Sequence, residues 1–130
     1  MKILMISDVY FPRVNGVATS ILTFVRCFLE RGHEVTLIAP EYPAEYDDEF
    51  DIIRIPSWQV PLDPEDRFMR IRQIKRLLPE LQQRDYDILH IHTPFVAHYS
   101  GRWLAKRLAI PMVLSYHTFF EAYLEKYMPW

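Results

Sequence analysis

The chain has 130 residues, 50% of them hydrophobic and 25% charged, with a formal net charge of -2. This composition is typical of one soluble globular domain and gives no electrostatic reason to expect a nucleic-acid partner. A single cysteine, Cys27, excludes an internal disulfide framework, and no apolar run approaches the roughly 20 residues that span a bilayer. The first eight residues are too short for a signal peptide and predict a buried strand, so we expect a cytoplasmic protein.

Five short segments rich in Ile, Leu and Val predict strands that alternate with longer stretches. They are Lys2–Ser7, Glu34–Ala39, Asp51–Pro56, Asp87–His92 and Met112–His117. The first two are nearly continuous apolar runs, which indicates strands buried on both faces of a parallel sheet.

Three of the intervening stretches have the apolar spacing of helices. The first, Val17–Leu29, should end at Gly32, a residue suited to the left-handed conformation that often follows a helix. The second, Ile71–Leu81, contains Pro79, and we expect it to break close to that residue. The third is Phe95–Leu108.

The proline-bearing segments 40–50 and 57–64 predict loops. Strands and helices that alternate at this spacing predict right-handed crossovers, and therefore an α/β fold with a doubly wound, Rossmann-like parallel sheet. Such sheets bind ligands beyond the carboxyl ends of their strands, where the strand order reverses. We therefore expect site residues within 8–16, 92–95 and 117–119.

The stretch PRVNGVATS, residues 12–20, links the first predicted strand to the first predicted helix. Its single glycine excludes the G-x-G-x-x-G dinucleotide fingerprint. Asn15 is a good N-cap residue, and Gly16 can adopt backbone angles that a side chain would forbid. The amides of Gly16, Val17 and Ala18 could then meet an anion at the positive end of the helix dipole. A capped helix start without a ligand fits the same residues.

Histidines lie at the ends of two predicted strands. His90 and His92 share one face of theirs and could bind a metal, but no third ligand is evident, which favours packed histidines without a metal. His117 ends the fifth strand, where a neutral imidazole could hydrogen-bond a substrate oxygen. A structural histidine is the alternative there.

Basic residues crowd the segment Arg67–Arg76, beside Phe68, Met69 and Ile71. A basic amphipathic helix can lie on an anionic membrane surface, whereas the usual role of such a run is a solvated face.

Two blocks of the chain, in this order and at this separation, resemble the N-terminal half of family 4 glycosyltransferases, which have the GT-B fold. The blocks are ISDVYFPRVNGVATSILTFVRCFLERGHEVTLIAP, residues 6–40, and DYDILHIHTPFVAHYSGRWLAKRLAIPMVLSYHTFFEAY, residues 85–123. Within the family, the chain is most similar to bacterial lipid glucosyltransferases and related mannosyltransferases.

The resemblance implies a cytoplasmic or membrane-peripheral enzyme that uses a nucleotide-sugar donor, such as a UDP- or GDP-sugar. It implies transfer of the sugar to a lipid or saccharide hydroxyl, with retention and usually without a metal. The phosphates of the donor would face Asn15, Gly16 and Val17, and His117 would lie at the reacting centre. Weaker candidates for contacts with the acceptor are Tyr10, Thr118, Glu121 and Tyr123.

Family members have two Rossmann-like domains and bind the nucleotide mainly in the C-terminal one. By this resemblance, residues 1–130 form the N-terminal, acceptor-side domain, which is itself expected to be incomplete. The C-terminal donor domain would be its partner, and the chain alone should not transfer sugar.

Two other classes of protein fit parts of the pattern. A non-catalytic module that binds a sugar or nucleotide would need the same cleft. A flavodoxin-like receiver domain has a similar length and five strand–helix repeats, but it needs an acidic pair after the first strand, where Asp8 stands alone.

Overall fold

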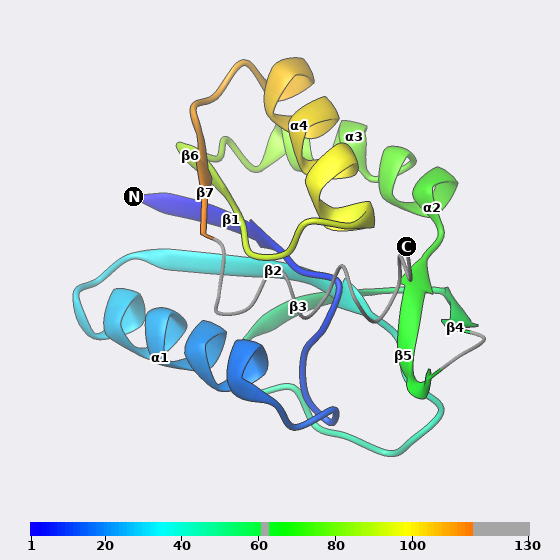
Figure 1. The fold of residues 1–130 in the computed structure, drawn as a ribbon. Helices are drawn as coiled ribbons and strands as arrows, with labels where there is room; N and C mark the ends of the chain where they lie inside the picture. Colours follow the sequence, from blue (N-terminus) through cyan, green and yellow to red (C-terminus); the bar gives the residue numbers. More distant parts are fainter. Residues whose placement is uncertain (61–62, 116–130) are drawn as a thin grey trace.

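The computed structural model describes residues 1–60 and 63–115, and a parallel sheet of five strands forms its centre (Figure 1). These strands are β1 (Lys2–Ile6), β2 (Glu34–Pro40), β3 (Asp51–Ile55), β6 (Ile88–Ile91) and β7 (Met112–Leu114). Their order across the sheet is β3-β2-β1-β6-β7. The predicted doubly wound α/β fold is therefore confirmed. Flavodoxin-like receivers have the strand order 2-1-3-4-5, so the receiver interpretation is wrong.

β1 is the central strand and is buried on both faces. Leu4, Met5 and Ile6 are all 0% exposed. Successive side chains of a strand point to opposite faces, so Met5 packs in the cluster under α1 (Gly16–Glu30), whereas Leu4 and Ile6 pack in the cluster on the other face. The continuous apolar run thus forms the middle layer of a three-layer structure.

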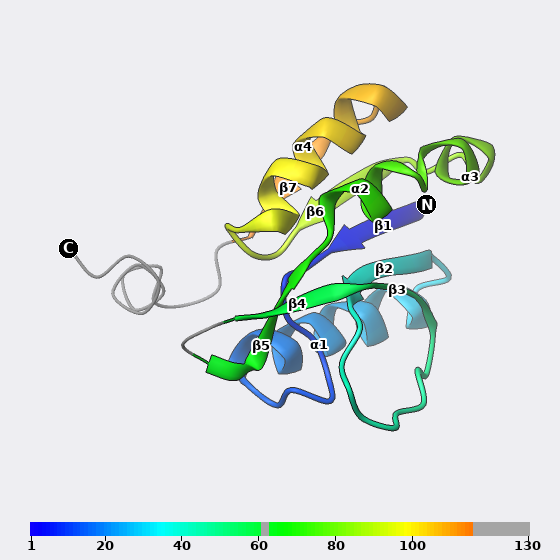
Figure 2. The same cartoon turned by 90° about the vertical axis from the view of Figure 1, so that its right-hand side faces the viewer.

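The helices cover the two faces of the sheet unequally. α1 lies on one face, and α2 (Ile71–Lys75), α3 (Leu78–Gln83) and α4 (Val96–Leu108) lie on the other (Figures 1 and 2). Among residues 1–60 and 63–115, none of the helices has the length and hydrophobicity needed to span a bilayer.

Two predicted helix boundaries are confirmed. Gly32 follows α1 with φ 84°, and its amide donates to the Leu29 carbonyl at 3.1 Å, while the His33 amide donates to the Phe28 carbonyl at 3.0 Å. This paired arrangement closes the end of a helix in the left-handed cap. The stripe that contains Pro79 is broken, because α2 ends at Lys75 and Pro79 lies in the first turn of α3, where its missing N–H is tolerated.

The predicted loop over 57–64 is wrong. β4 (Ser57–Val60) and β5 (Asp63–Met69) form a separate antiparallel ribbon, in which Trp58 pairs with Phe68. Each strand of a two-stranded ribbon has an open edge, where a proline removes no ladder hydrogen bond, so the prolines do not exclude strands here.

The ribbon also corrects the predicted basic helix over Arg67–Arg76. Arg67 belongs to β5, and Arg70 is the N-cap of α2, which itself has five residues. The basic residues therefore lie on a strand, a cap and a short helix rather than on one helical face.

The first prediction concerns Gly101 in α4, which lies directly against the sheet. A Cβ atom at this position would lie 2.7 Å from the Cδ1 and Cγ1 atoms of Ile91 and 3.1 Å from Cγ2 of Ile6, both buried. Gly101→Ala should lower the free energy of unfolding by about 1 to 3 kcal/mol, because overpacking outweighs the better helix propensity of alanine.

Urea denaturation would measure this loss, with Gly16→Ala as the matched control. A Cβ atom at Gly16 meets no atom of the described residues within 4 Å, so this variant should keep the wild-type stability to within about 0.5 kcal/mol. Equal stabilities for the two variants would contradict the close approach of α4 to the sheet.

Candidate functional site at the switch point

The strand order reverses between β1 and β6, and the segments that follow these two strands meet at the carboxyl edge of the sheet. The Asp8 amide, after β1, donates to Thr93 Oγ1, after β6, at 2.7 Å. Two of the three predicted site segments, 8–16 and 92–95, are therefore brought together as expected. The third, 117–119, lies outside the described residues, as do His117, Thr118, Glu121 and Tyr123.

Asp8 is the central polar residue of this edge. It lies within the predicted segment 8–16, but the sequence did not predict its role. Its Oδ2 atom accepts hydrogen bonds from Thr93 Oγ1 at 2.5 Å and from the Phe95 amide at 3.2 Å. Its Oδ1 atom accepts from the Ala97 amide at 3.1 Å. The carboxyl group of Asp8 thus caps the N-terminus of α4 from a different part of the chain.

The sequence indicates that the start of α4 needs an acceptor from outside the helix. The N-cap residue of α4 is Phe95, whose side chain cannot accept a hydrogen bond, so the first amides of the helix need an acceptor from elsewhere. The sequence does not say which residue supplies it.

Burial changes the acidity of Asp8, which is 8% exposed. Loss of water raises its pKa from 3.8 to about 6, and the hydrogen bonds from Thr93 and from backbone amides at the start of α4 offset only part of that rise. The proton of Asp8 is therefore held more tightly in the folded chain than in the unfolded one.

The start of α1 is the second element of the edge. Asn15 Oδ1 accepts a hydrogen bond from the Ala18 amide at 2.8 Å, which confirms Asn15 as the helix cap. Within the described part of the chain, the amides of Gly16 and Val17 donate to no acceptor. These two amides face outward from the positive end of a helix of 15 residues.

The predicted reason for glycine at position 16 needs correction. Gly32 is the glycine with positive φ in the described chain, so Gly16 does not adopt the left-handed conformation. No atom of the described residues lies within 4 Å of the place where its Cβ atom would be, so a side chain there would meet none of them. The side chain of Val17 is buried under α1, so only its backbone could face a ligand.

Tyr10 lies in the loop between β1 and α1 and is 4% exposed. Its ring packs edge-on against Phe11 and Phe50, and burial raises its pKa to about 12. It borders a hollow of about 260 Å³ beside the acidic residues Asp48 and Glu49. Contact between Tyr10 and an acceptor stays a prediction.

His90 and His92 share one face of β6 and its extension, as predicted. Their ring centroids are 3.9 Å apart, and Phe24 of α1 lies 5.5 Å from the His90 ring and 5.8 Å from the His92 ring. His90 Nε2 lies 2.6 Å from Ser115 Oγ. Among the residues that the structure describes, no three His, Cys, Asp or Glu side chains gather to hold a metal. Both rings thus form part of the packing between α1 and the sheet.

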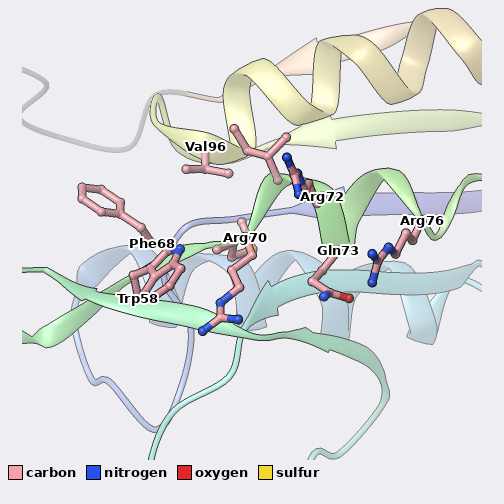
Figure 3. Close-up of a pocket in the computed structure, with 9 residues that line it drawn as sticks. Trp58, Phe68, Arg70, Arg72, Gln73, Arg76 and Val96 are labelled. Atoms are coloured by element: carbon pink, nitrogen blue, oxygen red, sulfur yellow. The ribbon is translucent and has the colours of Figure 1, made fainter.

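A second hollow, of about 740 Å³, lies between the β4–β5 ribbon, α2 and the start of α4 (Figure 3). We call it the ribbon hollow. It is lined by Trp58, Phe68, Met69, Arg70, Ile71, Arg72, Gln73, Arg76 and Val96. The guanidinium of Arg70 stands 4.0 Å from the Trp58 ring centroid. Among the side chains that the structure describes, 1–58 and 68–115, Arg70, Arg72 and Arg76 form no ion pair with a carboxylate. The hollow is therefore cationic with an apolar lining.

Comparison with known proteins gives consistent relatives. Residues 14–130 match the model of Glycosyltransferase Family 4. The chain is 36% identical over 126 residues to an alpha-monoglucosyldiacylglycerol synthase of Streptococcus pneumoniae, covering 95% of this chain and 28% of that protein. The synthase of the same name from Acholeplasma laidlawii is 32% identical over 125 residues, which cover 95% of this chain and 31% of that protein. A GDP-mannose-dependent alpha-mannosyltransferase of Corynebacterium glutamicum is 27% identical over 133 residues, which cover 98% of this chain and 32% of that protein.

Solved structures support the fold. A glycosyltransferase from Rickettsia africae aligns with a TM-score of 0.53 at 16% identity, over 98% of this chain and 34% of that one. The C-terminal domain of a Pyrococcus furiosus hydrogenase aligns with a TM-score of 0.57 at 17% identity, over 88% and 90%. The chain spans 28% to 32% of the length of the three curated relatives described above.

The second prediction follows from the pKa of Asp8. Because the folded chain binds this proton more tightly than the unfolded chain, the free energy of unfolding should fall as the pH rises from about 4 to about 6. The Asp8 contribution to that fall is roughly 2 to 3 kcal/mol, since one pKa unit corresponds to about 1.4 kcal/mol.

Chemical denaturation across this pH range would measure the slope in the wild type and in Asp8→Asn, which should lose the Asp8 contribution. Glu45→Gln removes an exposed carboxylate and should keep the wild-type slope. An Asp8→Asn profile parallel to the wild type would show that Asp8 titrates normally in the folded chain.

Proposed function

Because the chain belongs to glycosyltransferase family 4, we propose that the full-length protein containing it transfers a sugar from a nucleotide-sugar donor to a hydroxyl group of a lipid or saccharide acceptor. In this proposal the transfer retains the anomeric configuration and needs no metal or other cofactor. Residues 1–130 supply the acceptor-side domain, and a C-terminal domain supplies most of the donor site, so this chain alone is inactive.

The observation that carries the proposal is the open start of α1 at the switch point. When the bond between sugar and diphosphate breaks, negative charge develops on the departing diphosphate. The free amides of Gly16 and Val17 and the dipole of α1 would stabilise that charge. The N-terminus of α4 on the same edge is already occupied by Asp8, which leaves α1 to receive the phosphates.

His117 follows β7, the strand next to β6. We propose that its imidazole lies at the reacting centre, where it hydrogen-bonds the transferred sugar or positions the acceptor hydroxyl. Thr118, Glu121, Tyr123 and the bordering Tyr10 are the candidates for contacts with the acceptor.

The third prediction tests the two proposed site groups in the full-length protein. Gly16→Val should place a branched side chain in the open space before α1, and His117→Ala should remove the imidazole. Each variant should lower the turnover number by roughly 100-fold or more, with the thermal unfolding temperature unchanged. The valine side chain would keep the diphosphate away from the amides, and the alanine would lack the contact made by the imidazole. Release of nucleotide from GDP-mannose and from UDP-glucose would measure turnover.

Thr23→Val places the same branched side chain on an exposed position of α1, away from the helix start, and should keep wild-type turnover. Wild-type turnover in both Gly16→Val and His117→Ala would contradict the proposed mechanism. The non-catalytic binding module would be favoured by two results together: residues 1–130 alone bind the donor tightly, and the full-length protein transfers no sugar.

We also propose that the ribbon hollow contacts an anionic membrane surface, which would hold the enzyme beside a lipid acceptor at the cytoplasmic face. The arginines Arg70, Arg72 and Arg76 supply positive charge. Trp58, 60% exposed, and Ile71, 44% exposed, supply apolar groups at the same opening. Arg67, part of the predicted basic segment, lies on β5.

The fourth prediction concerns this surface. Arg72→Gln/Arg76→Gln should lower partitioning onto vesicles of phosphatidylglycerol and phosphatidylcholine by roughly 30-fold, since each basic residue near such a surface contributes about 1 kcal/mol. Co-sedimentation of the full-length protein with the vesicles would measure it.

The matched control is Arg26→Gln/Arg31→Gln, which removes two exposed charges from α1 and its C-cap, on the opposite face of the sheet. This variant should bind vesicles nearly as well as the wild type. Equal losses in the two double variants would show that net charge, rather than the ribbon hollow, determines binding.

A further inference from the structure

We propose that Asp8 is a positioning residue that fastens the loop after β1 to the start of α4, and so holds the open amides of Gly16 and Val17 in place for the donor. This inference rests on the proposed function for the identity of the ligand. It rests on the geometry of the described residues for the contacts themselves.

The first step is the double engagement of one hydroxyl group. Thr93 Oγ1 accepts a hydrogen bond from the Asp8 amide at 2.7 Å and donates its own hydrogen to Asp8 Oδ2 at 2.5 Å. Backbone and side chain of residue 8 are thereby tied to the same atom. This arrangement fixes both the path of the chain after β1 and the orientation of the carboxyl group.

Only a carboxylate can accept all the hydrogen bonds that reach the side chain of residue 8. Three donors reach the two oxygens of Asp8: the Thr93 hydroxyl and the Phe95 amide on Oδ2, and the Ala97 amide on Oδ1. An asparagine has one oxygen and one NH₂ group, so its NH₂ group would face at least one N–H or O–H donor. Asparagine fills the space of Asp8 without reproducing its hydrogen bonds.

The loop between β1 and α1 is held from two sides. The loop that leads to Asn15 is also held from the side of β2 and β3, by the Tyr10 amide, which donates to Tyr42 Oη at 3.3 Å, and by Arg54 Nη2, which donates to the Phe11 carbonyl at 2.8 Å. The Asp8 contacts hold it from the opposite side, at α4. Without them the loop keeps its ties to β2 and β3 but loses its tie to α4.

The start of α4 binds a carboxyl group, and a small free anion could replace that group. The Asp8 carboxyl group fills the N-terminus of α4 with an acceptor that belongs to the chain itself. Removal of the side chain, as in Asp8→Ala, leaves the Thr93 hydroxyl and two amides around a space the size of a small carboxylate. Formate can enter such a space and restore the three hydrogen bonds, whereas in Asp8→Asn the space is filled.

The fifth prediction is tested in the full-length protein with Asp8→Ala and Asp8→Asn, in sodium formate and in an equal concentration of sodium chloride. Both variants should raise the KM for the donor by about tenfold or more and leave the KM for the acceptor unchanged, because displaced amides weaken contact with the diphosphate alone. Formate should return the donor KM and the melting temperature of Asp8→Ala toward the wild type and leave Asp8→Asn unaffected. Glu45→Gln should match the wild type throughout.

A merely structural role would lower the melting temperature but leave the donor KM of the folded variant unchanged, and that result would overturn the proposal. Equal effects of formate on both variants would overturn it as well. If the wild type transfers sugar from neither GDP-mannose nor UDP-glucose, the proposed function fails, and the amide NMR resonances of Gly16 and Val17 then decide the positioning role. Those resonances should shift in Asp8→Ala and return with formate, and unshifted resonances would contradict the proposal.

Discussion

The burial of β1 on both faces is the constraint on which the rest of the structure depends. A strand whose side chains are apolar on both faces must have helices on both sides of the sheet. The chain reaches both sides because the connection from β1 to β2 crosses one face and the connection from β3 to β6 crosses the other. The connection through α1 leads to β2, and the later connection leads to β6 on the other flank. The switch point, and with it the meeting of the two loops, follows from this packing rather than from any motif in the loops.

A buried carboxyl group at the carboxyl edge of the sheet is the second consequence. Asp8 follows the apolar run of β1 and has little access to water, which alone would make its charge unfavourable. The N-terminus of α4 supplies the hydrogen bonds and the positive dipole that make the position tolerable. The two features compensate each other, because α4 has no acceptor at its own N-cap. Asp8 and the start of α4 therefore form one unit, although they are far apart in the sequence.

The sequence predicted those features that depend on neighbouring residues. Apolar runs predicted the five strands of the sheet. Asn15, which caps its own helix, and Gly32, which adopts a positive φ, predicted the two ends of α1. The ribbon of β4 and β5 was missed because prolines argue against strands in general, whereas a two-stranded ribbon has edges that accept them. The contact between Asp8 and Ala97 was missed because it joins residues 89 positions apart, and no local pattern encodes such a pairing.

The first turn of α4 connects the two candidate surfaces of the molecule. Phe95 and Ala97 donate their amides to Asp8 at the switch point, while the side chain of Val96, between them, lines the ribbon hollow. A lipid acceptor that entered from a membrane at the hollow would therefore arrive within one helical turn of the Asp8 contacts. In the proposed enzyme, a single rigid helix start would set the distance between the membrane-facing arginines and the amides that face the donor. Because Val96 lies between the two donor amides, the packing that holds α4 against the sheet also fixes how far the hollow lies from the Asp8 contacts.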